Sequence, residues 1–152
     1  YALPVHLTHY WALFITLALA AVFFILFLRE LGVGPAGALI GSLGYLAGNM
    51  TYARDLVLGT SLFVQAALFW TLIKIYKSDS KKTRIVFILF GGGLVGYGWW
   101  VAAYFPILYI ALITFSFVLF LGLRDGAKKN LFRMLSTIFF IFLIGTTIGL
   151  LQ

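Results

Sequence analysis

Apolar runs separated by charged and turn-forming residues are the main pattern along the chain. A helix needs about 20 apolar residues to cross the hydrocarbon core of a membrane. The pattern therefore predicts an all-α fold, a polytopic transmembrane bundle of six helices. The runs cover residues 9–28, 35–48, 56–75, 85–100, 105–123 and 131–151.

Polar segments between the runs supply the turns. Arg29 ends the first run, and a glycine-rich turn leads to Pro35, which suits the first position of a helix because its φ is already helical. Longer polar loops cover residues 77–84 and 124–130. The short loops leave no room for a soluble domain, so residues 1–152 are predicted to be one transmembrane domain. Because the sequence does not begin with Met, we interpret it as a fragment of a longer membrane protein.

Composition and charge narrow the possible partners. The chain has 152 residues, of which 63% are apolar and 10% charged, whereas soluble domains average about 45–50% and about 25%. Its net charge of +7 would suggest nucleic acid in a soluble protein, but a mean hydropathy of +1.09 argues against that class. We therefore expect membrane lipids as partners and no nucleic acid. The absence of cysteine excludes disulfides, thiolate metal sites and cysteine nucleophiles.

The basic residues predict an orientation. Ten of the eleven lie at the end of the first, third or fifth apolar run or after it, and only Arg54 follows the second. Lys and Arg are enriched in cytoplasmic loops, so both ends of this segment are predicted to lie outside, in a prokaryotic cytoplasmic membrane. The two long basic loops are expected to set this topology and to touch anionic lipid headgroups. A specific partner site there is the alternative.

Glycines are spaced along one face of three predicted helices. They are Gly37, Gly41, Gly44 and Gly48 in the second helix, Gly92 and Gly96 in the fourth, and Gly145 and Gly149 in the sixth. Residues three or four apart share a helix face, and small residues let helix backbones approach closely within a membrane. The spacing predicts close helix packing at all three faces and nothing catalytic.

Arg54 and Asp55 are the candidate substrate-binding residues. They lie in the short polar segment between the second and third runs, and they are the only charged pair on the predicted outer side. Arginine suits bidentate contacts to phosphate or carboxylate. Aspartate can bind sugar hydroxyls, act as a base or hold a divalent metal through oxygen. The competing interpretation is a solvated loop, or an ion pair with a neighbouring helix.

A metal or cofactor site has little support in the sequence. His6 and His9 would share a helical face, but two histidines without an acidic neighbour make a poor zinc site. Tyr10 and Trp11 follow directly, so an aromatic belt at the membrane interface fits this segment better than ligation. No metal site is predicted, and the cofactor stays unknown.

The layout resembles the polyprenyl-phosphate-dependent membrane glycosyltransferases, the GT-C group, and within it the protein-mannosyltransferase-like branch. Residues 10–32 look like the family helix that ends in "llxRxlG". A Gly/Ala-rich helix follows at 36–48, and an outer stretch with Arg and Asp at 52–55. Residues 62–72 resemble a helix of the type "ffxxlaly", and 91–106 resemble a Gly-rich helix with an aromatic middle.

The resemblance implies transfer of a sugar from a polyprenyl-phosphate carrier on the extracytoplasmic face, with a divalent cation possible in the family and Arg54 against the carrier phosphate. The family's catalytic acid lies in an outer loop that would precede residue 1, so no catalytic residue is assigned. The family's outer Asp follows its Arg by about six residues, where this chain has Thr60, whereas Asp55 is adjacent to Arg54. The alternative function is a non-catalytic accessory subunit of a larger membrane complex, and whether the chain is an enzyme stays open. A transporter is a weaker third hypothesis, because it would need polar residues in mid-helix.

Overall fold

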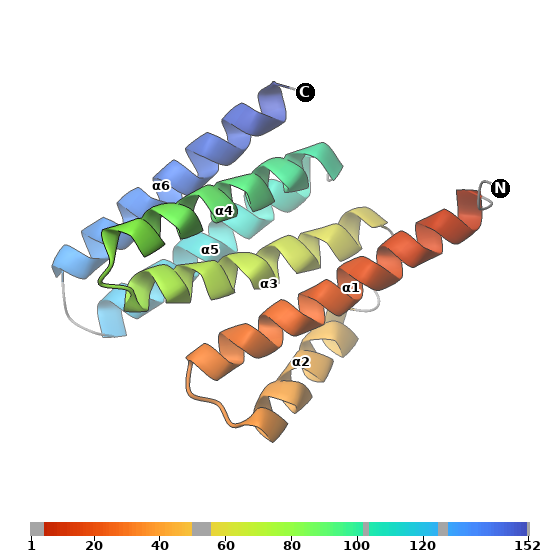
Figure 1. The fold of residues 1–152 in the computed structure, drawn as a ribbon, viewed down its shortest axis with the longest axis horizontal. Coiled ribbons are helices and arrows are strands. Elements are labelled where there is room, and N and C mark those ends of the chain that lie inside the picture. Colours follow the sequence, from red (N-terminus) through yellow and green to blue (C-terminus); the bar gives the residue numbers. More distant parts are fainter. Residues whose placement is uncertain (1–4, 50–55, 102–103, 125–127, 152) are drawn as a thin grey trace. The chain divides into compact units, whose positions relative to one another are not determined.

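The computed structural model describes residues 5–49, 56–101, 104–124 and 128–151. These residues form six helices and no strand, which confirms the all-α prediction (Figure 1). The helices are α1 (Val5–Glu30), α2 (Pro35–Asn49), α3 (Leu56–Lys77), α4 (Lys81–Val101), α5 (Tyr104–Arg124) and α6 (Lys128–Leu150).

Three helices of the described residues are long and apolar enough to cross a membrane. The qualifying stretches are Thr8–Glu30, Gly59–Lys77 and Leu131–Leu150, and a shorter apolar stretch covers Leu108–Gly122 in α5. That all six helices insert into a membrane stays a prediction.

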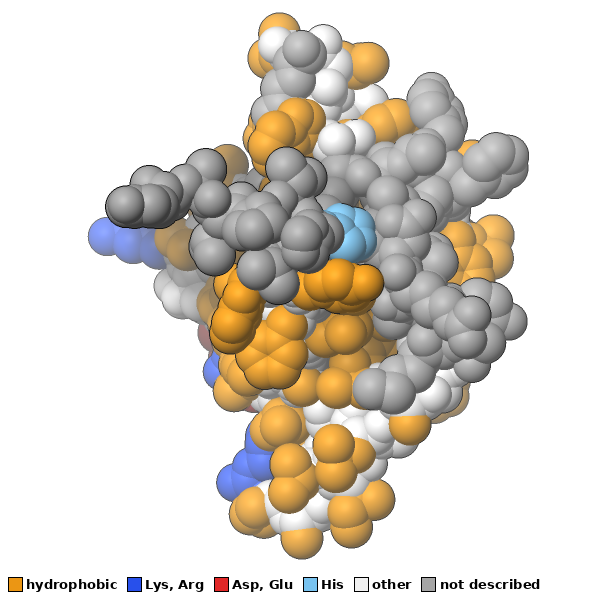
Figure 2. Space-filling view, turned by 90° about the vertical axis from the view of Figure 1, so that its right-hand side faces the viewer, with side chains coloured by type: hydrophobic (Ala, Val, Ile, Leu, Met, Phe, Trp, Pro, Cys, Tyr) orange, Lys and Arg blue, Asp and Glu red, His pale blue; other side chains and the backbone are white. Residues whose placement is uncertain are grey.

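Large apolar side chains on the surface fit a lipid environment. Phe14, Leu112 and Phe139 are each more than 60% exposed, and apolar side chains dominate the coloured part of the face drawn in Figure 2. Soluble monomers rarely expose apolar patches on this scale, because each exposed side chain forgoes the free energy gained on leaving water. The surface therefore favours a membrane protein over a soluble one.

The chain forms two compact units, residues 1–70 and residues 71–152, and α3 runs through the boundary between them. The first unit contains α1, α2 and the larger part of α3. The second contains the end of α3 together with α4, α5 and α6.

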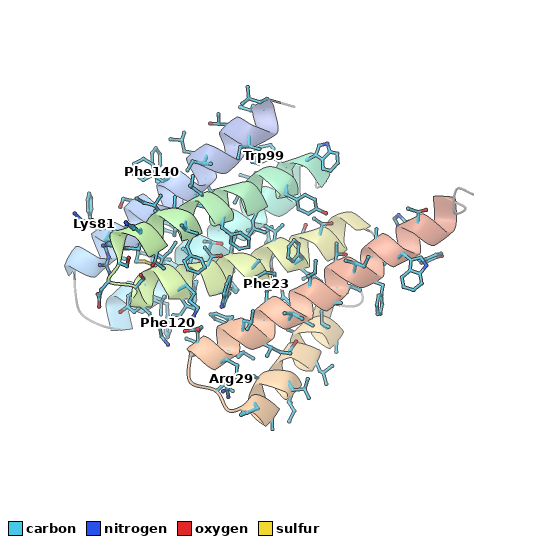
Figure 3. The ribbon with its side chains drawn as sticks, in the orientation of Figure 1. Phe23, Arg29, Lys81, Trp99, Phe120 and Phe140 are labelled. Atoms are coloured by element: carbon cyan, nitrogen blue, oxygen red, sulfur yellow. The ribbon has the colours of Figure 1, made fainter. Side chains whose placement is uncertain are left out.

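The core of the first unit lies between α1 and its two neighbours. Ala20 of α1 and Leu62 of α3 are buried at its centre. Phe23, labelled in Figure 3, lies with its ring centroid 5.7 Å from that of Phe63. The unit is therefore held by small residues where the helices lie close together and by aromatic rings where the helices lie further apart.

A glycine ends α1 and turns the chain toward α2. Gly32 has a φ of +89°, in the left-handed region that side chains other than glycine rarely adopt. Its backbone N–H donates to the Arg29 carbonyl at 3.0 Å, and the next N–H, of Val33, donates to the Leu28 carbonyl at 3.0 Å. These two bonds are a Schellman motif, which satisfies carbonyls that the last helical turn leaves open. The predicted turn before Pro35 is confirmed.

The second unit is built around a parallel pair, α4 and α6, that meet through their glycines. A methyl group at Gly92 would lie 2.6 Å from Cγ2 of Ile144, and one at Gly96 would lie 2.8 Å from Cγ2 of Ile148. In the reverse sense, a methyl group at Gly145 would lie 2.9 Å from the Gly92 carbonyl oxygen. The close packing predicted for these two helices is confirmed, and contacts that advance together along both chains make the pair parallel (Figure 1).

In α2 the same prediction holds for the first half, where a methyl group at Gly41 would lie 2.7 Å from Cδ1 of Leu28 in α1, and it is wrong for the second half. Methyl groups at Gly44 and Gly48 would meet no atom within 4 Å, and the buried residues of the helix are Ala38 and Ser42. The Ser42 hydroxyl donates to the Ala21 carbonyl of α1 at 3.1 Å, which fixes the rotation of α2 about its axis. The rotation that gives the Ser42 hydroxyl its acceptor on α1 leaves the last two glycines of the stripe uncovered.

Candidate functional site

Arg54 and Asp55 lie outside the described residues, in the connection between α2 and α3. That connection is bounded by Asn49, where α2 ends, and Leu56, where α3 begins. The substrate-binding role of both residues stays a prediction. The described residues of the first unit give the local chemistry on either side of the connection.

A tyrosine hydroxyl joins α2 to α3 just before this connection. Tyr45 Oη donates to the Leu62 carbonyl at 3.0 Å and lies 3.4 Å from Oε1 of Gln65. Its ring stacks on Phe24 of α1, with centroids 4.2 Å apart and planes 7° from parallel. One side chain therefore ties three helices together at the level where the candidate segment leaves α2.

The last turn of α2 is closed by its own final side chain. Asn49 Nδ2 donates to the Tyr45 carbonyl at 2.8 Å. The final side chain of α2 therefore folds back onto the preceding turn of its own helix. The Tyr45 residue is thereby held at both its backbone and its hydroxyl, and the end of α2 is well fixed.

The first turns of α3 approach α1 closely. A methyl group at Gly59 would lie 2.6 Å from Cδ1 of Leu13 and 3.3 Å from Oγ1 of Thr16. Thr16 itself donates to the carbonyls of its own helix, at 2.9 Å to Leu13 and 3.1 Å to Ala12. A side chain at this position would have to displace the end of the Leu13 side chain of α1.

Thr60, which the resemblance would match to the family's outer aspartate, is fully buried. Its Oγ1 has no hydrogen-bond partner among the described residues. A hydroxyl buried in this way costs free energy rather than offering a surface group for a substrate. The residue therefore does not replace the family's aspartate in an exposed binding role.

Among the described residues, the polar side chains around this connection carry hydroxyl or amide groups. They can donate and accept hydrogen bonds, but they include no base beside a nucleophile. No group of three His, Cys, Asp or Glu side chains within the described part of the chain could hold a metal ion. His9 is exposed, and its ring meets Tyr10 edge-on with centroids 6.2 Å apart, whereas the side chain of His6 lies outside the description.

Tyr45 and Gln65 are the residues that sequence reasoning missed. Both are polar positions inside apolar runs, and a hydrogen-bonding side chain in a membrane segment must find a partner or carry a function. That signal was present in the sequence at Gln65, near the middle of the third apolar run.

Comparison with protein-family models, with curated proteins and with solved structures found no match to the chain.

Proposed function

We propose that the chain is the membrane-embedded part of a glycosyltransferase-like protein that binds a polyprenyl-phosphate carrier through Arg54 on the extracytoplasmic face. The support is the resemblance over residues 9–123 to the GT-C group, together with the order of the six helices. The carrying observation is the connection between α2 and α3. It is short, it contains Arg54 and Asp55, and it joins helix ends that the Tyr45 hydrogen bonds fix in place.

The chemistry of the two charged residues suits a phosphate-linked sugar. The guanidinium of Arg54 offers paired donors that match two oxygens of a phosphate. The carboxylate of Asp55 accepts hydrogen bonds from sugar hydroxyls. A competing role for Asp55 comes from its position directly before Leu56, the first residue of α3, because Asp is preferred immediately before the first turn of a helix.

The proposed orientation follows from the basic residues. Arg54 is the single basic residue assigned to the outer side, against ten assigned to the cytoplasm, so the charge bias opposes its position. A residue retained against that bias is explained by a specific anionic ligand. Both ends of this segment lie outside in this arrangement, in a prokaryotic cytoplasmic membrane.

The test is the affinity of the full-length protein for a polyprenyl phosphate in detergent. Arg54→Gln is expected to weaken binding at least tenfold, since a charge-assisted contact is worth about 1.5–3 kcal/mol. Arg54→Lys should weaken it less, because the charge is kept and the paired donors are lost. Arg124→Gln, a matched change assigned to the cytoplasmic side, should leave binding unchanged.

The second candidate is a non-catalytic subunit that packs against other membrane proteins. The open face of α2 favours it, because Leu39, Ile40 and Leu43 are all more than half exposed beside the uncovered Gly44. Unchanged carrier affinity in Arg54→Gln, with an unchanged melting temperature, would remove the phosphate role and leave this candidate ahead.

A further inference from the structure

Basic residues gather at the start of two parallel helices in the second unit, away from the residues used above. Lys81 and Lys82 occupy the first turn of α4, and α6 begins with Lys128 and Lys129. Neither helix has an acidic residue in its first turn. Lys81 is labelled at the start of α4 in Figure 3.

This placement of charge is unfavourable for the isolated helices. The first turn of a helix carries free N–H groups and about half a unit of positive charge, so cations there are repelled and anions are attracted. Basic residues are favourable at the other end of a helix, as Arg29 is in the last turn of α1. Two helices that repeat the unfavourable arrangement at the same end of a parallel pair form a strongly positive locus.

Two partly buried arginines add to the positive charge of this locus. Arg84 of α4 and Arg133 of α6 are half-buried, and the Nε atom of each is buried with no hydrogen-bond partner among the described residues. A buried charged donor without an acceptor is costly, so an acceptor that satisfied both would be bound favourably. This observation is independent of the helix ends and favours an anionic partner for these two half-buried arginines.

The glycine contacts between the helices put the two arginines at one level. Gly91 of α4 faces Ile141 of α6, since a methyl group there would lie 3.1 Å from Cδ1 of that residue. Arg84 precedes Gly91 by seven residues, and Arg133 precedes Ile141 by eight. At about 1.5 Å of rise per residue, this contact puts the two arginines within about one residue of each other in height, and the contact of Gly96 with Ile148 puts them within about three.

The neighbours of the arginines indicate an amphipathic ligand rather than a soluble anion. Ile85 and Val86, next to Arg84, are 57% and 62% exposed, and Phe132, next to Arg133, is 77% exposed. A phosphate held by the guanidiniums would therefore have apolar surface beside it for acyl chains. Asp79, in the connection before α4, is the acidic side chain that the description includes near this end, and it is exposed.

We propose that the amino-terminal ends of α4 and α6 form a binding site for an anionic phospholipid, with the headgroup phosphate held by Arg84 and Arg133. The site needs no contribution from Arg54, so it stands or falls separately from the proposed function. The proposal goes beyond a general attraction between basic loops and anionic lipid, because it assigns the contact to two defined side chains.

The test is to titrate phosphatidylglycerol into the full chain in detergent and follow its melting temperature. Phosphatidylglycerol is expected to raise it, whereas phosphatidylcholine and inorganic phosphate at the same concentration are not. Arg84→Gln and Arg133→Gln should each weaken the apparent affinity about tenfold or more. Arg29→Gln removes the same charge at a helix carboxyl end, where Arg29 is exposed and bonds the Val33 carbonyl, and should leave the affinity unchanged.

Several results would overturn the proposal. Wild-type affinity in Arg84→Gln and Arg133→Gln would do so, and so would an equal loss in Arg29→Gln, which would show unspecific attraction. An equal rise with inorganic phosphate would assign the site to a soluble anion. If the glutamine variants do not fold, Arg84→Lys keeps the charge and should weaken phosphatidylglycerol binding several-fold, because an ammonium lacks the paired donors; wild-type affinity there would refute the guanidinium contact.

Discussion

The glycine contact between α4 and α6 can be tested by replacing one glycine at the contact and one glycine away from it. A methyl group at Gly145 would meet the Gly92 carbonyl oxygen at 2.9 Å, as well as the Val95 side chain. A carbonyl oxygen is part of the helix backbone and cannot rotate away, so Gly145→Ala must push the two helices apart. Gly93 is the control, because a methyl group there would meet no atom within 4 Å.

Two opposing terms set the size of the effect. Replacing glycine by alanine within a helix gains about 1 kcal/mol in helix propensity, and this gain applies to both variants. Overpacking at Gly145 opposes this gain and costs about 1–3 kcal/mol. We therefore expect Gly93→Ala to be neutral or stabilising and Gly145→Ala to be less stable than Gly93→Ala by about 1–3 kcal/mol.

The assay is unfolding of the detergent-solubilised chain, by heat or by titration with a denaturing detergent. For a chain of this size about 1 kcal/mol corresponds to roughly 2–4 °C, so the two variants should differ in melting temperature by roughly 2–12 °C. Equal melting temperatures for Gly145→Ala and Gly93→Ala would refute the close approach of α4 and α6.

Two further predictions concern the first unit and the topology. Tyr45→Phe keeps the ring stacked on Phe24 but removes the hydroxyl that donates to the Leu62 carbonyl, so it should lower the free energy of unfolding by about 0.5–1.5 kcal/mol; an unchanged value in denaturant titration would contradict the bond. Ser80→Cys gives a single thiol in a chain without cysteine and should react with an impermeant reagent only from the cytoplasmic side; labelling of intact cells would reverse the orientation.

Helix number and approximate bounds could be predicted because glycine, proline and charge interrupt the apolar runs. Pro35 and Leu56 begin helices where the pattern placed them. α4 begins one turn before the predicted Ile85, at Lys81. The Ser80 hydroxyl accepts the Thr83 backbone N–H at 3.4 Å, which lets the helix start among polar residues. The length of an apolar run therefore predicts the segment that suits the hydrocarbon core. The helix itself extends beyond that segment where a polar side chain caps its end.

Which face of a helix meets which neighbour could not be read from glycine spacing alone. The stripes in α4 and α6 face each other, yet the second half of a similar stripe in α2 is left open. The difference is that α2 also carries Ser42 and Tyr45, whose hydroxyls donate to carbonyls of α1 and α3. In α2 the observed rotation is the one that gives both hydroxyls an acceptor on a neighbouring helix, and it leaves Gly44 and Gly48 uncovered.

The glycine pairing of α4 and α6 also bears on the basic locus at their amino-terminal ends. Without close packing, two helices that each begin with lysines would separate to reduce the repulsion between their positive ends. The contacts at Gly92 and Gly145 hold them parallel in spite of it. The free energy of that close packing therefore offsets the repulsion between the lysines at the two helix ends. A bound anion would reduce this repulsion further.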